Sequence, residues 1–256
     1  MTQYSDHHGP EGLLIRGTII VVPGRGETRH TYTRFARRLA SDAYRVRVID
    51  APVLDAEDPD GSLTGLAERL TDAIGGTASE DGVALPVVLV GADTGAAALA
   101  ALLGRTGTAP EPDALVLAGL PGPSTGSAAG VGSWDDELDV RTSCPTHRGT
   151  LTQDAGVRRG SLGDAVPDSV LAAAHESTTG VPTLLLAGDA DPLADHEALA
   201  RAVKSLPRAR LSVVHGAHHD VLNDLQHRSV AAEVVTFLEA LRNDLRPPVT
   251  VRSSAW

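Results

Sequence analysis

Residues 86–95 read PVVLVGADTG and lead directly into AAALAALL at 96–103, and this stretch decides the fold. The apolar, β-branched run at 86–90 is typical of a buried strand, and the alanine-rich run is typical of a helix. A sharp turn between them holds Asp93 in strained backbone geometry, and the glycines two positions before and after let the neighbouring chain pass without collision. The sequence therefore predicts that the Asp93 side chain stands exposed at the end of a strand, near a helix N-terminus that favours negative charge.

Strands and helices alternate on both sides of this turn. Further apolar segments with strand character occur at 17–23, 45–50, 114–119, 182–188 and 209–214. Segments with helical periodicity occur at 32–40, 63–74, 196–205 and 228–242. This alternation predicts an α/β fold with a mainly parallel sheet and helices on both faces. Ligands of such sheets bind at the carboxyl ends of the strands.

The alternation stops for about sixty residues after the strand at 114–119. This stretch begins with the low-complexity run PGPSTGSAAGVGS, continues through the polar run WDDELDVRTSCPTHRG, and contains a short helical pattern at 167–175. We therefore expect residues 1–120 and 181–256 to form one α/β core, and residues 121–180 to form a lid inserted into it.

The composition restricts the class of protein. The 33 acidic and 22 basic residues give a net charge of -11, which argues against binding nucleic acid or an anionic membrane by bulk electrostatics. The single cysteine, Cys144, excludes an internal disulfide framework. Residues 1–12 lack the pattern of a signal peptide, and no window reaches the roughly 20 apolar residues of a membrane helix. We expect a cytoplasmic protein with a small-molecule partner, with His7 and His8 in a disordered N-terminus. Its oligomeric state stays open.

A second motif, GPSTG at 122–126, matches the pattern G-x-S-x-G literally. A run rich in glycine and serine follows it, without helical periodicity, so the strand-turn-helix context that gives this pattern its meaning is missing. We therefore interpret Ser124 as part of a flexible loop at the start of the insertion.

Four segments together resemble the α/β-hydrolase superfamily, and in particular its aspartate-nucleophile branch of epoxide hydrolases and haloalkane dehalogenases. They are PGRGE at 23–27, GADTG at 91–95, GDADPL at 188–193 and GAHHDVLND at 216–224. Each follows an expected strand, and the order of nucleophile, acid and histidine matches that of the superfamily. The resemblance extends over most of the chain.

This resemblance implies a catalytic role for three residues. Asp93 stands at the nucleophile position, Asp191 at that of the acid, and His219 at that of the histidine. Asp189 is a neighbouring contender for the acid, and His218 replaces His219 if the loop is shifted by one residue.

The resemblance also implies an oxyanion hole made of two backbone N–H groups, those of Thr94 and Arg25. Epoxide hydrolases usually carry an apolar or aromatic residue at the position of Arg25. Its guanidinium could pair with a substrate carboxylate, pair with Asp93, or face solvent near Glu27.

An aspartate at the elbow predicts a particular chemistry. A carboxylate is ionised at neutral pH and attacks without a base, and attack on the sp³ carbon of an epoxide gives an ordinary ester. His219, oriented by Asp191, then activates water against that ester. Two alternatives stay open: a lyase, isomerase or decarboxylase with Asp93 as base or electrostatic group, and a ligand-binding protein without catalysis.

The two lid tyrosines of the resembled epoxide hydrolases are absent here, because the only tyrosines precede the insertion. Candidate substrate-binding residues in the lid are Trp134, His147 and Arg148, and further candidate donors are Cys144, Arg141 and Tyr32. Cys144 and His147 have the spacing of a metal half-site, but no second pair completes it. We therefore expect neither a metal nor another cofactor.

Overall fold

A computed structural model describes residues 4–105, 107, 110–124 and 132–254. Within these ranges, no helix combines the length and the apolar character that crossing a membrane requires. Thr125 and Gly126 of the GPSTG motif lie outside the described residues.

The core of the molecule is one seven-stranded sheet with the strand order β1-β3-β2-β4-β5-β6-β7. All neighbouring strands are parallel except β1, which pairs antiparallel with β3. The predicted mainly parallel sheet is therefore confirmed. The strands are β1 (Ser5–His7), β2 (Thr18–Val22), β3 (Arg45–Val48), β4 (Val87–Ala92), β5 (Ala114–Ala118), β6 (Thr183–Gly188) and β7 (Ala209–Val214).

Strand β1 corrects one prediction at the N-terminus. His7 and His8 were expected in a disordered tail, but His7 belongs to β1 and pairs with Val46. Arg47 of β3 holds the strand, because its guanidinium donates to both carboxylate oxygens of Asp6 at 2.6 and 2.7 Å. The expectation of disorder was therefore wrong, since a three-residue strand is too short for its pattern to be recognised in a sequence.

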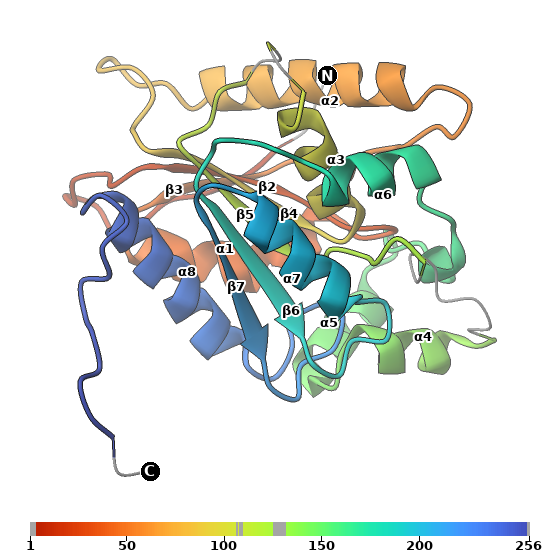
Figure 1. Cartoon of the computed structure of the whole chain (residues 1–256). Coiled ribbons are helices and arrows are strands. Elements are labelled where there is room, and N and C mark those ends of the chain that lie inside the picture. The colour runs from red at the N-terminus through yellow and green to blue at the C-terminus, as the bar shows by residue number, and fades with distance from the viewer. Residues whose placement is uncertain (1–3, 106, 108–109, 125–131, 255–256) are drawn as a thin grey trace.

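Helices cover both faces of the sheet (Figure 1). On one face, α1 (Thr33–Ser41) and α8 (His227–Leu241) pack over alternate strand residues such as Ile19 and Val21. The opposite face carries Ile20, Val22 and four further helices. These are α2 (Pro59–Gly75), α3 (Thr94–Leu103), α6 (Asp168–His175) and α7 (His196–Ser205). The sheet is thus buried on both sides, as its continuously apolar strands require.

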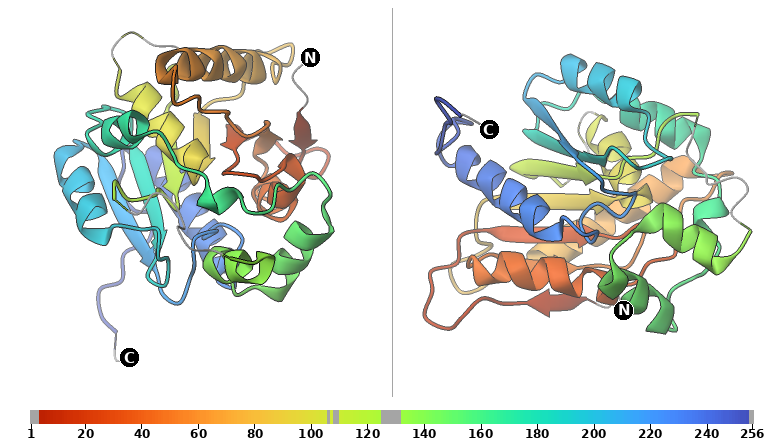
Figure 2. Two further views of the ribbon diagram at one scale, coloured as in Figure 1. Left: turned by 90° about the vertical axis from the view of Figure 1, so that its right-hand side faces the viewer. Right: turned by 90° about the horizontal axis from the view of Figure 1, so that it is seen from below.

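The insertion follows β5 and contains α4 (Trp134–Arg141), α5 (Pro145–Gln153), the 3-10 helix η2 (Ser161–Gly163) and α6. Helices α4 and α5, drawn in green, lie at the edge of the sheet toward which the parallel strands point (Figures 1 and 2). Helix α6 packs instead against α3, within the layer of core helices. The lid boundaries at residues 121–180 remain a prediction.

Candidate active site

The turn between β4 and α3 places Asp93 in a strained conformation, with φ of 47° and ψ of -118°. A side chain at Gly95 would meet the Val22 carbonyl oxygen at 2.3 Å, and one at Gly91 would meet the Gly95 backbone at 2.6 Å. Steric crowding therefore requires glycine at both positions, as expected from the sequence. Strain of this kind concentrates at functional sites, where the surrounding packing maintains it.

Three residues from separate loops meet at this turn. His219 Nε2 lies 3.2 Å from Asp93 Oδ1, and His219 Nδ1 lies 2.9 Å from Asp191 Oδ2. Asp191 Oδ1 accepts the backbone N–H of Leu193 at 2.8 Å, which orients its carboxylate. Although His219 Nε2 is close to Asp93, it has no aligned hydrogen-bond partner in the part of the chain that the structure describes. The contact between Asp93 and His219 is therefore mainly electrostatic.

Asp189 and His218, the alternatives to Asp191 and His219, have partners other than Asp93. His218 Nδ1 lies 3.0 Å from Asp224 Oδ2, and the Asp189 carboxylate lies 2.8 Å from His215 on the surface. The structure thus brings Asp93, Asp191 and His219 together, and it brings neither His218 nor Asp189 to Asp93.

Arg25 occupies the space in front of Asp93. Its Nη2 lies 2.8 Å from Asp93 Oδ1, its Nε donates to Oδ2 at 2.9 Å, and its backbone N–H donates to Oδ2 at 2.7 Å. Of the partners weighed for this guanidinium, Asp93 is therefore the one it has in this structure. The contact of the Arg25 N–H with Oδ2 agrees in geometry with an oxyanion-hole donor, whereas no contact of the Thr94 N–H tests its expected role.

The insertion holds Arg25 in this position. Arg25 Nη1 donates to the backbone carbonyls of Asp164 at 2.6 Å and Leu162 at 3.3 Å. The Arg25 carbonyl accepts in turn from Arg141 Nη2 at 2.9 Å and from the Ser161 hydroxyl at 3.1 Å. Hydrogen bonds from the segment between α4 and η2 thus stabilise the turn that contains Arg25 and covers Asp93.

These contacts shift the pKa values of Asp93 and His219 in opposite directions. Burial alone would raise the pKa of Asp93, but the charges of Arg25 and His219 hold it well below its ordinary value. Burial alone would lower the pKa of His219, but the carboxylates of Asp191 and Asp93 raise it to about 10. At neutral pH Asp93 is therefore negatively charged and His219 positively charged.

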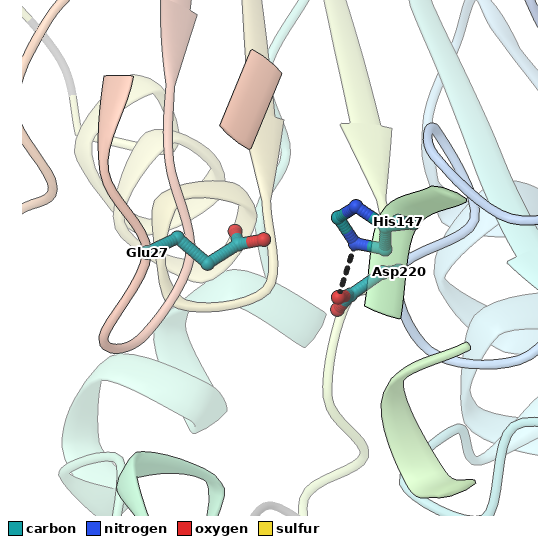
Figure 3. Close-up of side chains that lie close together, drawn as sticks. All are labelled: Glu27, His147 and Asp220. Atoms are coloured by element: carbon teal, nitrogen blue, oxygen red, sulfur yellow. Dashed lines mark hydrogen bonds and ion pairs between the residues drawn. The ribbon is translucent and has the colours of Figure 1, made fainter. Parts of the chain in front are cut away.

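A second group of titratable side chains lies behind the first, and Figure 3 shows Glu27 facing Asp220 and His147. Their nearest ligand atoms lie within 4.8 Å of one another, and two carboxylates with an imidazole are a donor set that divalent cations accept. His147 Nε2 and Asp220 Oδ2 lie 2.8 Å apart, and Arg141 Nη1 lies 3.5 Å from Asp220 Oδ1. Arg141 therefore already supplies a positive charge where an ion would have to bind.

Glu27 is a buried carboxyl of this second group. Its Oε2 accepts from the Tyr32 hydroxyl and, at 3.0 Å, from the Gly24 N–H, whereas Oε1 is buried without a hydrogen-bond partner. Burial and the negative charge of Asp220 raise the pKa of Glu27 to about 8. Glu27 therefore carries a proton at neutral pH.

Two cavities border the site. The larger, of about 410 Å³, is lined by Arg25, Thr94 and the lid segment 164–167. The smaller, of about 10 Å³, is lined by Tyr32, Asp93 and His219 and is too small for a substrate. Because Arg25 borders the larger cavity and also covers Asp93, the carboxylate becomes accessible from that cavity only when the guanidinium moves.

The structure places the expected lid residues in different surroundings. Trp134 Nε1 donates to the Thr152 hydroxyl at 3.1 Å, and Arg148 pairs with Asp139 at 2.6 Å. Neither residue lines the two cavities beside Asp93, and their expected role in substrate binding stays a prediction. His147 is buried and contacts Asp220, the residue that follows His219 in the sequence. Ser124 lies exposed in a turn, away from any strand-to-helix elbow.

Sequence reasoning missed Glu27, Glu137 and Ser161. Glu137 accepts from Arg141 at 3.0 Å and is fully buried, although it lies in the polar run of the insertion. A spacing of four residues between Glu137 and Arg141 is an available signal, because such residues neighbour each other on a helix. The sequence gives no sign that this pair is buried.

Comparisons with known proteins support a hydrolase fold. The model of the TAP-like protein family matches residues 165–246, and a search of curated protein sequences gave no significant match. A soluble variant of monoglyceride lipase from Saccharomyces cerevisiae superposes with a TM-score of 0.73 at 14% identity, over 93% of this chain and 91% of that one. For the monoacylglycerol lipase of Paleococcus ferrophilus these values are 0.67, 18%, 94% and 99%. For the proline iminopeptidase of Mycobacterium smegmatis they are 0.65, 18%, 96% and 96%.

Proposed function

Because the chain has the α/β-hydrolase fold, we propose that it is a hydrolase in which Asp93 forms a covalent ester with a small epoxide-type substrate. The observation that carries the proposal is the strained elbow at Asp93, with His219 at 3.2 Å and Asp191 behind it. This arrangement of Asp93, His219 and Asp191 supports a two-step covalent mechanism, which needs a nucleophile, a histidine and an acid in contact with the histidine.

The charge of Asp93 favours a nucleophilic role over that of a general base. Its low pKa makes it a weak proton acceptor, whereas attack on an sp³ carbon requires only an ionised oxygen. Attack on an ester carbonyl would give a high-energy anhydride. Attack on an epoxide carbon gives a stable ester, and ring strain drives the reaction, so epoxides are the substrate class that fits an aspartate nucleophile.

In the first step Asp93 Oδ1 attacks the epoxide carbon and the ring C–O bond breaks, which leaves an alkoxide. This step requires that the guanidinium of Arg25 move away from Oδ1. In its new position the guanidinium can stabilise the charge of the alkoxide. His219 is protonated in the resting state, and its Nε2 proton is not engaged in an aligned hydrogen bond. We therefore assign the proton that neutralises the alkoxide to His219, which makes the missing lid tyrosines unnecessary.

In the second step His219 acts as the base. Once Asp93 is an ester, one of the two carboxylates that raise the pKa of His219 is gone, so the neutral imidazole can take a proton from water. Water attacks the ester carbonyl carbon, and negative charge develops on Oδ2. The Arg25 N–H already lies 2.7 Å from this oxygen, where an oxyanion-hole donor is needed. The bond between the carbonyl carbon and Oδ1 then breaks, Oδ1 leaves with the product as a hydroxyl of the diol, and the Asp93 carboxylate and the protonated His219 are restored.

The test is a single turnover with a panel of monosubstituted epoxides in water labelled with heavy oxygen, followed by mass spectrometry of the peptide that contains Asp93. Label in the Asp93 carboxylate is expected, because water attacks the enzyme carbonyl and leaves its oxygen there. Asp93→Asn is the matched control, and it should form no diol in the same period.

Turnover without label in Asp93 would remove its role as nucleophile and would favour a non-hydrolytic or general-base reaction at the same site. The firm pairing of Arg25 with Asp93 favours one further candidate, a ligand-binding protein in which this pair is permanent. Absence of turnover for every epoxide, together with retention of ligand by Asp93→Asn, would support that candidate instead.

A further inference from the structure

A groove of about 640 Å³ lies on the side of the molecule that carries α1, between that helix, the 3-10 helix η1 (Arg29–Tyr32) and α5. Helix α5 packs against η1, and Asn223 closes one end of the groove. Neither Asp93 nor His219 lines it. The groove therefore does not open onto Asp93, although His147 of the second titratable group lines it and Asn223 also borders the small cavity beside Asp93.

The side chains that line this groove are almost all hydrogen-bond donors. Arg34, Arg37 and Arg38 come from α1, where spacings of three and four residues place them on one side of the helix. The other lining residues are hydroxyl, imidazole and amide side chains, with Asp42 as the single acid, and none has an apolar side chain. We call this groove the arginine groove.

The positive charge of the arginine groove is not balanced within the chain. In the residues that the structure describes, no carboxylate lies within ion-pairing distance of these three arginines, whereas Arg16, Arg47 and Arg148 elsewhere in the molecule each contact one. Arg34 donates to Cys144 Sγ at 3.4 Å and to the backbone carbonyl of Asn223, and both partners are uncharged. Arg38 Nε is buried without a hydrogen-bond partner.

The field of these arginines also acts on a neighbour. Burial lowers the pKa of His227, and the charges of Arg34, Arg38 and Arg228 lower it further. A protein with a net charge of -11 thus keeps a concave, cationic surface at one place.

We propose that the arginine groove, lined by Arg34, Arg37 and Arg38, binds a small organic phosphate with two or more negative charges. Arginine presents paired N–H donors that match phosphate oxygens, and threonine hydroxyls in the groove add further donors. The volume is that of an ordinary small-molecule site. A lipid phosphate would share the headgroup chemistry, but the lining provides no apolar residue to enter a membrane, so a free molecule is the occupant.

Isothermal titration calorimetry of the full chain with inorganic pyrophosphate tests this proposal. Wild type should bind, and Arg37→Gln/Arg38→Gln should bind at least about tenfold more weakly, because the variant loses charge-assisted hydrogen bonds to the phosphate oxygens. Binding should also weaken as salt is added. Arg201→Gln/Lys204→Gln removes the same charge from exposed positions of α7, on the other face of the sheet, and should bind like wild type.

Circular dichroism tests whether the variants are folded. The single variant Arg37→Gln changes an exposed position and provides a second measurement of pyrophosphate affinity. Equal affinity of wild type and both double variants would overturn the proposal, as would absence of pyrophosphate binding to wild type. Vesicles of phosphatidylcholine with phosphatidic acid distinguish the second source of phosphate. Binding to these vesicles without binding of pyrophosphate would also overturn the proposal and would indicate a membrane contact.

Discussion

The surroundings of Asp93 and the arginine groove differ in whether their charged side chains have partners of opposite charge. We call Asp93, Arg25, His219 and Asp191 the buried charge cluster, in which every charged group lies within 3.2 Å of an opposite charge. In the arginine groove, Arg34, Arg37 and Arg38 have no carboxylate partner among the described residues. Both regions contain arginine, so the difference does not come from residue type.

Solvent explains this difference. Taking an ion out of water costs several kcal/mol, and a buried ion persists only where a partner of opposite charge compensates that cost. At the surface, water and salt screen the charge, and a partner is not required for folding. An unmatched surface charge is therefore available to a ligand, whereas a matched buried charge becomes available only after its partner moves.

The largest expected effect is on stability, when the buried charge cluster is broken. Arg25→Ala leaves Asp93 buried beside His219 alone, and we expect it to lower the free energy of unfolding by about 3–5 kcal/mol. Arg37→Ala in the arginine groove should change it by less than about 0.5 kcal/mol, because that side chain is exposed and has no ion pair. Urea denaturation measures both.

A double-mutant cycle separates the ion pair from lost packing. Adding Asp93→Asn to Arg25→Ala removes the unpaired carboxylate, so the double variant should be more stable than the sum of the two single effects predicts. Additive losses would show that the pair contributes no interaction energy and would contradict the contrast between the two regions.

The fold and the centre of the site were accessible from the sequence because local rules decide them. Gly91 and Gly95 have no room for a side chain, and this crowding marks the elbow irrespective of the rest of the molecule. The apolar strands and the helical periodicity likewise reflect burial that recurs along each segment. Asp191 and His219 were implied by the resemblance of the segments at 188–193 and 216–224 to the α/β-hydrolase superfamily, and each segment adjoins the end of such a strand.

The network behind the site could not be predicted, because it depends on contacts between distant segments. Arg141 donates to the carbonyl of Arg25, which is 116 residues away, and Glu137 is buried only because the lid folds onto the elbow. The pairing of Arg25 with Asp93 remained one of three alternatives for the same reason. Polar residues in a lid have no periodic pattern that distinguishes a buried ion pair from a solvated surface.

Glu27→Gln is expected to have an intermediate effect on stability. Glu27 is buried like the members of the buried charge cluster, but it carries a proton at neutral pH. Its pKa is raised from 4.5 to about 8, so the stability it contributes is fully present below pH 4.5 and is lost as the pH rises through about 8. Glu27→Gln resembles the protonated form. We therefore expect similar stability of the two proteins near pH 5 and greater stability of the variant, by several kcal/mol, near pH 9.

Urea denaturation at a series of pH values measures this difference. His219 contributes a pH dependence of the same sign, lost between pH 6.5 and about 10, but it is common to both proteins and cancels in the comparison. A constant difference between Glu27→Gln and wild type at every pH would show that the pKa of Glu27 is not raised.

The smallest expected effect is a shift in the pKa of His227, which lies near the arginines of the groove. Burial, Arg34, Arg38 and Arg228 all lower the pKa of His227, so Arg38→Gln should raise it toward its ordinary value of 6.5. Pyrophosphate in the groove should raise it as well, since an anion cancels the same field, and Arg201→Gln should leave it unchanged. Titration of the His227 ring by NMR measures these shifts. An unchanged pKa in Arg38→Gln would mean that solvent already screens these arginines, so that the groove offers an anion much less than its composition implies.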